Sequence, residues 1–131
     1  MKTPIVDFVT EYAASDTVRL HMPGHKGTAV LGCEALDITE ISGADALYEA
    51  GGIIGESEKN ATGLFQTART LYSTEGSTQC IKGMLELARR WWQHKQELPG
   101  KRPVVVAARN VHKAFLYAAV LLDFDVVWLW R

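Results

Sequence analysis

The spacing of hydrophobic residues along the chain changes near residue 70. Before it, a short helix is predicted to begin with Thr3 as N-cap and Pro4 at the first helical position. A second helix is predicted over 53–69. Residues 19–52 are rich in glycine and lack periodicity, which indicates ordered loop. The apolar face of the first helix is Ile5, Phe8, Val9 and Tyr12, and that of the second is Ile54, Ala61, Leu64, Phe65 and Ala68.

Strand and helix patterns alternate after that point. Strands are predicted at 69–74 ("RTLYST"), 103–108 ("PVVVAA") and 125–130 ("DVVWLW"), and helices at 77–95 and 112–122. The inward stripe of the helix at 77–95 is Ile81, Met84, Leu85, Ala88, Trp91 and Trp92. The order β-α-β-α-β predicts an α/β fold with a mostly parallel sheet at 71–131, preceded by an arm of helix and loop at 1–70. Both strand-to-helix turns, "EGSTQ" and "RNVHK", should lie at the carboxyl edge of that sheet, where ligands bind.

Composition and charge narrow the function classes. The 131 residues carry 14 basic and 15 acidic side chains, which argues against a broad nucleic-acid footprint. No apolar run is long enough to span a bilayer, and the N-terminus does not resemble a signal peptide. The two cysteines form no CxxC pair, so a reducing cytoplasm is the simplest location. The sequence stops directly after an apolar strand pattern, which indicates a piece of a longer protein.

The turn Glu75–Gln79 is the first candidate site. Gly76 permits a tight turn, and the unpaired amides at the start of the following helix favour an anion. The hydroxyls of Ser77 and Thr78 add donors, so a phosphate could be held without lysine. Ordinary N-capping by Ser77 or Thr78 is the alternative.

His112 and the loop "RLHMPGHKG" are the other candidates. His112 opens the helix after the second strand, where it should lie near Gly76 and could stack on a planar ring or move a proton. In the loop, His21 and His25 lack a Cys or carboxylate nearby that would complete a metal set, and no metal site is expected. The acidic residues Glu40, Asp45, Glu49, Glu56 and Glu58 are interpreted as caps and solvated faces.

Four segments together resemble the N-terminal part of the bacterial ornithine/lysine/arginine decarboxylases, which are fold type I enzymes that use pyridoxal 5′-phosphate (PLP). They are "RLHMPGHKG", "DITEISGADALYEAGGIIGESEKNATGLF", "YSTEGSTQCIKGML" and "RNVHKAFLYAAVL". The resemblance implies that Gly76, Ser77 and Thr78 bind the PLP phosphate and that His112 stacks on the pyridine ring. It also implies that a loop of His21, Pro23, Gly24, His25 and Lys26 lies near the active site and a dimer interface. The segment 37–45 is expected to pack close to that site.

The resemblance has departures. Ala114 stands where the family usually has serine, and Cys80 and Ile81 follow the Gly-Ser-Thr turn where the family often has Gly-Asn. The family's Schiff-base lysine and its acidic partner for the pyridine nitrogen lie further downstream, so Lys26 and Lys113 match neither. The chain is therefore expected to be the N-terminal fragment of a decarboxylase. The whole enzyme is expected to release CO2 and an amine from a basic amino acid. The fragment itself is expected to be inactive.

Two alternatives remain open. The chain could belong to another fold type I PLP enzyme, such as an aminotransferase or a lyase, although the HMPGHKG loop weighs against it. It could also be a truncated, non-catalytic subunit partner. The expected ligand is a small basic amino acid, and the full-length protein is expected to form a homodimer or higher homo-oligomer without nucleic acid or membrane.

Overall fold

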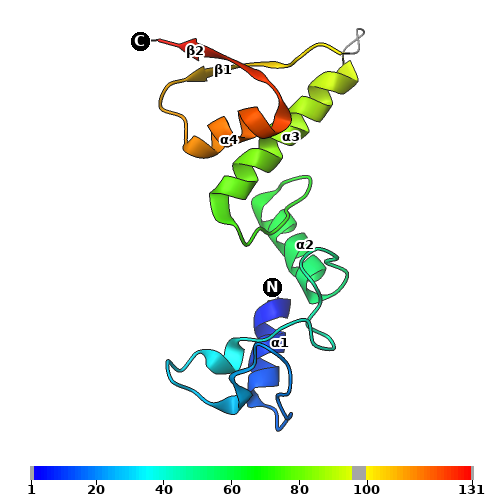
Figure 1. The fold of residues 1–131 in the computed structure, drawn as a ribbon. Helices are drawn as coiled ribbons and strands as arrows, with labels where there is room; N and C mark the ends of the chain where they lie inside the picture. Colours follow the sequence, from blue (N-terminus) through cyan, green and yellow to red (C-terminus); the bar gives the residue numbers. More distant parts are fainter. Residues whose placement is uncertain (1, 96–99, 131) are drawn as a thin grey trace. The chain divides into compact units, whose positions relative to one another are not determined.

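The computed structural model describes residues 2–95 and 100–130 (Figure 1). The chain forms two compact units, Met1–Tyr72 and Ser73–Arg131. Their boundary falls close to the one expected after residue 70. Each unit has its own internal contacts.

The first unit is built on two helices, α1 (Pro4–Ala14) and α2 (Ile53–Phe65), which pack against each other. Between them lie two short 3-10 turns, η1 (His25–Gly27) and η2 (Glu34–Leu36). Helix α1 starts at Pro4 as predicted, and its expected face of Ile5, Phe8, Val9 and Tyr12 is half-buried. Thr3 is the N-cap residue, as predicted, but its side chain makes no capping hydrogen bond. Its N–H and its hydroxyl instead donate to the Asp7 carboxylate at 3.1 and 2.7 Å.

Helix α2 ends earlier than predicted. Gln66 takes a left-handed conformation with a φ of 52°, and this turns the chain out of the helix after Phe65. The expected inward positions Leu64 and Phe65 are 61% and 69% exposed, which corrects that assignment. The helix instead buries Glu58, which the sequence placed on a solvated face.

The segment 69–74 is not a strand, contrary to the prediction. Its backbone hydrogen-bonds to side chains of α2 instead of to another strand. The N–H of Thr70 donates to the Thr62 hydroxyl at 2.8 Å, and the N–H of Tyr72 donates to the Glu58 carboxylate at 2.7 Å. These polar side chains compete with a sheet ladder for the same backbone groups, which explains both the missing strand and the burial of Glu58.

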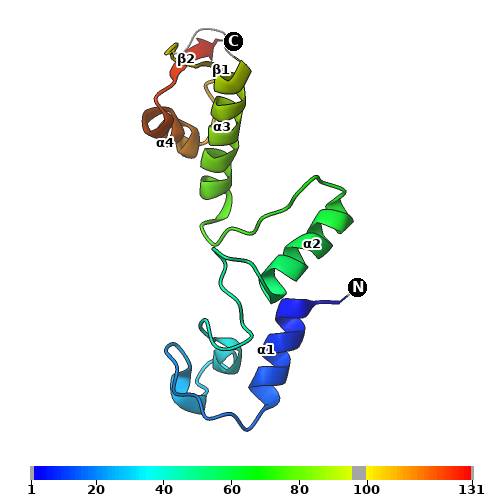
Figure 2. The same cartoon turned by 90° about the vertical axis from the view of Figure 1, so that its right-hand side faces the viewer.

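The second unit consists of α3 (Gly76–Lys95), β1 (Val104–Ala108), α4 (Lys113–Leu122) and β2 (Asp125–Leu129). The two strands pair in parallel from Val104 opposite Asp125 to Ala108 opposite Leu129. Figures 1 and 2 show α4 beside α3, on one side of the strand pair. The strand pair and the helices were predicted, but the described residues hold two strands where the sequence led us to expect three.

The core of this unit is small and aromatic. Ala107, Phe115, Ala118 and Phe124 are its buried members, and Leu85, Val105 and Trp128 are among the half-buried residues packed on it. Met84 and Trp91, predicted to face inward from α3, are 60% and 65% exposed. Alternate strand positions also remain exposed, namely Val104, Val106, Val127 and Leu129. The described residues of this unit therefore cover one face of the strand pair and leave the other exposed.

Candidate functional site

The turn Gly76–Thr78 at the start of α3, the cradle, has the open backbone geometry expected of an anion-binding site. Gly76 has a φ of +62°, in the left-handed region that side chains disfavour, and a Cβ built there would meet no atom within 4 Å. The helix begins at Gly76, so Ser77 and Thr78 lie inside its first turn and not at the N-cap. The side-chain bond at this turn runs from the Ser73 hydroxyl to the Gln79 amide oxygen at 2.5 Å.

This arrangement leaves donors available. The first backbone N–H groups of a helix have no partner inside the helix, and α3 is 20 residues long. Among the described residues, no side-chain hydrogen bond occupies the hydroxyl of Ser77 or Thr78. Ser77 is exposed and Thr78 is half-buried, so both hydroxyls are near solvent. The chemistry of this donor set suits an anion with several oxygens.

His112 caps α4, as its position at the helix start predicted. Its Nδ1 accepts from the N–H of Ala114 at 3.2 Å, which fixes Nδ1 as an acceptor. In the neutral ring, the proton is then on Nε2. The imidazole is exposed, whereas Ala114 is completely buried against the core. A serine at position 114 would therefore bring a hydroxyl into a site without solvent.

The structure places His112 and the cradle in the same unit but shows no bond between them. Their helices α3 and α4 pack together. Among the described residues, no hydrogen bond joins His112 to Gly76, Ser77 or Thr78. The two features are independent candidates for parts of one site.

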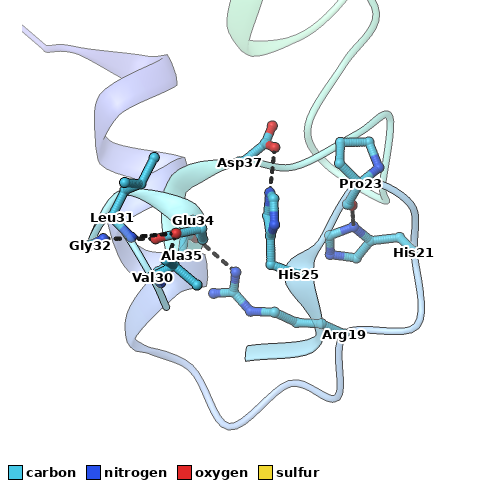
Figure 3. A network of polar contacts seen from close by, with 10 residues as sticks. All are labelled: Arg19, His21, Pro23, His25, Val30, Leu31, Gly32, Glu34, Ala35 and Asp37. Carbon is cyan, nitrogen blue, oxygen red and sulfur yellow. Dashed lines mark hydrogen bonds and ion pairs between the residues drawn. The ribbon is translucent and has the colours of Figure 1, made fainter. Parts of the chain in front are cut away.

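Three of the residues in the loop His21–Lys26 form a local polar structure in the first unit (Figure 3). His21 lies between the Tyr12 hydroxyl, 2.9 Å from its Nε2, and the carbonyl oxygen of Pro23, which accepts from its Nδ1. His25 donates from Nε2 to the Asp37 carboxylate at 2.8 Å. This contact ties the loop to the acidic segment 37–45, an association that the sequence order alone does not reveal.

The backbone of this loop is unusual at three residues, Gly24, His25 and Lys26. A Cβ at Gly24 would lie 2.7 Å from the carbonyl oxygen of His21, so the close approach requires glycine. His25 and Lys26 both have φ values near +50°, at 48° and 49°. Non-glycine residues rarely hold this conformation, and such strained backbone gathers at functional sites.

Sequence reasoning missed Glu34, which organises the neighbouring turn. Its buried carboxylate accepts from the N–H groups of Val30, Leu31 and Gly32 at 2.7, 2.6 and 2.8 Å. The N–H of Leu31, followed by those of Glu34 itself and of Val30, lowers the pKa of Glu34 to about 2, against a smaller raising effect of burial. A glutamate shortly after a glycine-containing turn was the available signal.

Arg19 extends the same network. One guanidinium nitrogen donates to the carbonyl oxygen of Ala35 at 2.8 Å, and the guanidinium carbon lies 5.0 Å from the Tyr12 ring centroid. Arg19, His25, Lys26 and Glu34 line a hollow of about 590 Å³ in this unit. The loop is thus held by a cation–π contact between Arg19 and Tyr12 and by polar bonds. Figure 3 shows the hydrogen bonds of Arg19, His25 and Glu34.

Asp45 acts as a cap, as expected. Its carboxylate accepts from the N–H groups of Ala46, Gly51, Gly52 and Ile54 at 2.8 to 3.2 Å. Burial raises the pKa of Asp45, but these four N–H groups together outweigh it and lower the pKa overall. Asp45 therefore fixes the start of α2 and is ionised at neutral pH.

Metal and membrane features are absent from the part of the chain that the structure describes. Within residues 2–95 and 100–130, no three His, Cys, Asp or Glu side chains are grouped so that they could hold a metal ion. None of the helices over these residues combines the length and the apolar character needed to cross a membrane.

The chain forms two units, and the second holds a two-stranded parallel sheet with helices packed on it. Comparison with known proteins adds distant likeness to arginine decarboxylases. The chain is 29% identical over 129 residues to an arginine decarboxylase of Halalkalibacterium halodurans, which covers 91% of this chain and 24% of that protein. The arginine decarboxylase of Bacillus subtilis is 26% identical with the same coverage, and the uncharacterized YaaO of that species is 26% identical over 98% of this chain and 27% of its own.

The chain thus spans about a quarter of the length of these curated relatives. No family model matches the chain, and no solved structure matches it. What the comparisons establish is a distant sequence relationship to decarboxylases.

Proposed function

We propose that this chain is part of a PLP-dependent amino-acid decarboxylase of fold type I, and that it holds the phosphate end of the cofactor. The observation that carries the proposal is the likeness to arginine decarboxylases over 91% of the chain. Because the relatives are named for arginine, arginine is the first substrate to test, with lysine and ornithine as the other members of the proposed class.

The residues of the second unit fit the phosphate end of PLP. Gly76 leaves open space at the start of α3, and the first amides of that helix would donate to an anion bound there. Ser77 and Thr78 would donate their hydroxyls to phosphate oxygens. When bound, PLP supplies an electron sink for the carbanion left by CO2 loss.

His112 is proposed to contact the ring of the cofactor. Its exposed imidazole is held at the start of α4 by the bond from the Ala114 N–H, so its orientation is fixed before a ligand arrives. Because Nδ1 accepts from the Ala114 N–H, Nε2 is the nitrogen that would donate a proton.

The first unit is proposed to contribute near the substrate or at a subunit interface. The His21–Lys26 loop is ordered by His25–Asp37 and His21–Tyr12 contacts, so it presents a defined surface. The whole protein is proposed to act as a homodimer or higher homo-oligomer in the cytoplasm. None of the lysines in this chain matches the family lysine that bonds the cofactor covalently, and we propose that the chain alone does not release CO2.

Calorimetric titration with PLP and with pyridoxal, which lacks the phosphate, tests the proposal. PLP should bind at least tenfold more tightly than pyridoxal, because the cradle recognises the phosphate. The double variant Ser77→Ala/Thr78→Val should lose most of that difference. A matched control, Ser42→Ala, removes an exposed hydroxyl in the first unit and should bind PLP like the parent chain.

Two results would count against it. Equal affinity for PLP and pyridoxal would show that the chain does not recognise the phosphate group. Release of CO2 from L-arginine by the chain alone, measured with PLP present, would refute the claim that it lacks a covalent lysine.

A further inference from the structure

A second hollow lies in the second unit, beyond the ends of the two strands. Arg109 follows the last residue of β1, and Trp130 follows the last residue of β2. Together with Val111, Leu116 and Trp128 they line a space of about 420 Å³. The cradle residues Gly76–Thr78 and His112 are not among its lining residues.

The strand register explains why Arg109 and Trp130 meet. Ala107 lies opposite Trp128, and both belong to the side of the strand pair on which Phe115 packs. Alternate residues of a strand point to the same side. Arg109 and Trp130 continue that alternation by one step on each strand, and the Arg109 guanidinium carbon lies 4.6 Å from the Trp130 ring centroid.

One wall of the hollow packs against the core, and the other is exposed to solvent. Trp128 is half-buried and meets Phe115 edge to face, with ring centroids 6.2 Å apart, so the core fixes one wall. Trp130 is 73% exposed and Leu116 is 45% exposed. A flat ring that entered here would cover both apolar surfaces and contact an indole that already has a defined position.

Among the described residues that line the hollow, Arg109 is the charged one. Arg89 pairs with Glu86 and Arg102 pairs with Asp123 and Asp125, but no ion pair joins Arg109 to any other residue that the structure describes. The guanidinium is held over the indole face while its donors remain available for a planar oxyanion. Arg109, Trp128 and Trp130 thus combine one planar cation with two indoles.

We propose that this hollow binds a small planar aromatic carboxylate, with the carboxylate on Arg109 and the ring against Trp128 and Trp130. The volume is within the range of small-molecule sites and suits a ligand of one or two rings. The inference goes beyond the proposed decarboxylase function and does not depend on it, since the phosphate cradle uses other residues.

Titration with 2-naphthoate tests the inference, with naphthalene-2-methanol as the neutral probe of the same shape. Tryptophan fluorescence and calorimetry should both show saturable binding of the carboxylate, at least tenfold tighter than the alcohol. Arg109→Gln should weaken 2-naphthoate binding about tenfold or more, because a charge-assisted hydrogen bond is lost. Trp130→Leu should weaken binding of both probes.

The controls separate this site from folding and from the cradle. Arg102→Gln removes an exposed arginine near the opposite end of the strands and should leave 2-naphthoate affinity unchanged. The variant Ser77→Ala/Thr78→Val should also bind 2-naphthoate normally, whatever its effect on PLP. Circular dichroism should show that Arg109→Gln remains folded. Equal affinity for the two probes, undiminished binding by Arg109→Gln, or no saturable binding to the folded chain would overturn the inference.

Discussion

Replacing Phe115 by alanine should remove most of the stability of the second unit. Phe115 is 8% exposed and contacts Phe124 and Trp128 edge to face, at centroid distances of 5.6 and 6.2 Å. Truncating a buried phenylalanine to alanine costs about 3 to 5 kcal/mol. A unit of about 60 residues has a total stability of roughly 3 to 9 kcal/mol. The lost free energy is therefore comparable to the whole.

Urea denaturation followed by tryptophan fluorescence measures this effect selectively. All four tryptophans lie in this unit, at positions 91, 92, 128 and 130. The Phe115→Ala chain should show a midpoint close to zero urea or no cooperative transition. A control, Leu121→Ala, truncates a residue of the same helix that is 68% exposed, and it should change the unfolding free energy by about 0.5 kcal/mol or less.

A clear outcome would refute the packing argument. If Phe115→Ala and Leu121→Ala lowered the midpoint equally, Phe115 would not be the centre of this core. A loss of less than about 1 kcal/mol would lead to the same conclusion, because no cavity of the expected kind would have formed.

Two further predictions concern the polar contacts. The pKa of Glu34 falls from 4.5 to about 2 in the folded chain, so its stabilising effect is full above pH 4.5 and is lost as the pH falls toward 2. Hydrogen exchange of the amides of 30–32, referenced to their intrinsic rates, should lose protection over that window, and Glu34→Gln should lose it at neutral pH; unchanged protection would contradict the network. His112→Ala should lower the stability of the second unit by about 1 kcal/mol while His112→Asn largely preserves it, as read from urea midpoints. Equal midpoints for the two variants would show that the cap contributes nothing.

The most regular parts of the fold could be predicted from the sequence. Strands were predicted at 103–108 and 125–130 and are found at 104–108 and 125–129, and the helix that His112 opens was also predicted. The expected burial of both strand faces is wrong, because alternate residues of each strand are exposed. Their pattern is local, because each run has few polar residues to support another conformation. The prediction of a strand at 69–74 was wrong, since the side chains of Thr62 and Glu58 in the preceding helix accept hydrogen bonds from its backbone.

The candidate sites also include features that the sequence predicted and features that it did not. The sequence predicted the Gly76–Thr78 turn and its position at a helix start, because glycine and hydroxyl residues have strong local preferences. The pairing of His25 with Asp37 could not be read from spacing, because it depends on how an irregular loop closes. For Glu34, the nearby glycine turn was a signal, but the three amides it accepts from are brought together only by that loop. The roles of these residues toward PLP and a basic amino acid remain predictions from the resemblance.

The sequence by itself determined the kinds and order of the main elements in the second unit and the residue types available at its turns. Hydrophobic periodicity and turn chemistry act over a few residues, so they can be read without a fold. Only the tertiary structure decided which groups meet. Parallel register brought Arg109 against Trp130, and loop closure buried Glu34 beneath three amides. Those contacts depend on residues far apart in the chain or on backbone conformations that no local pattern specifies.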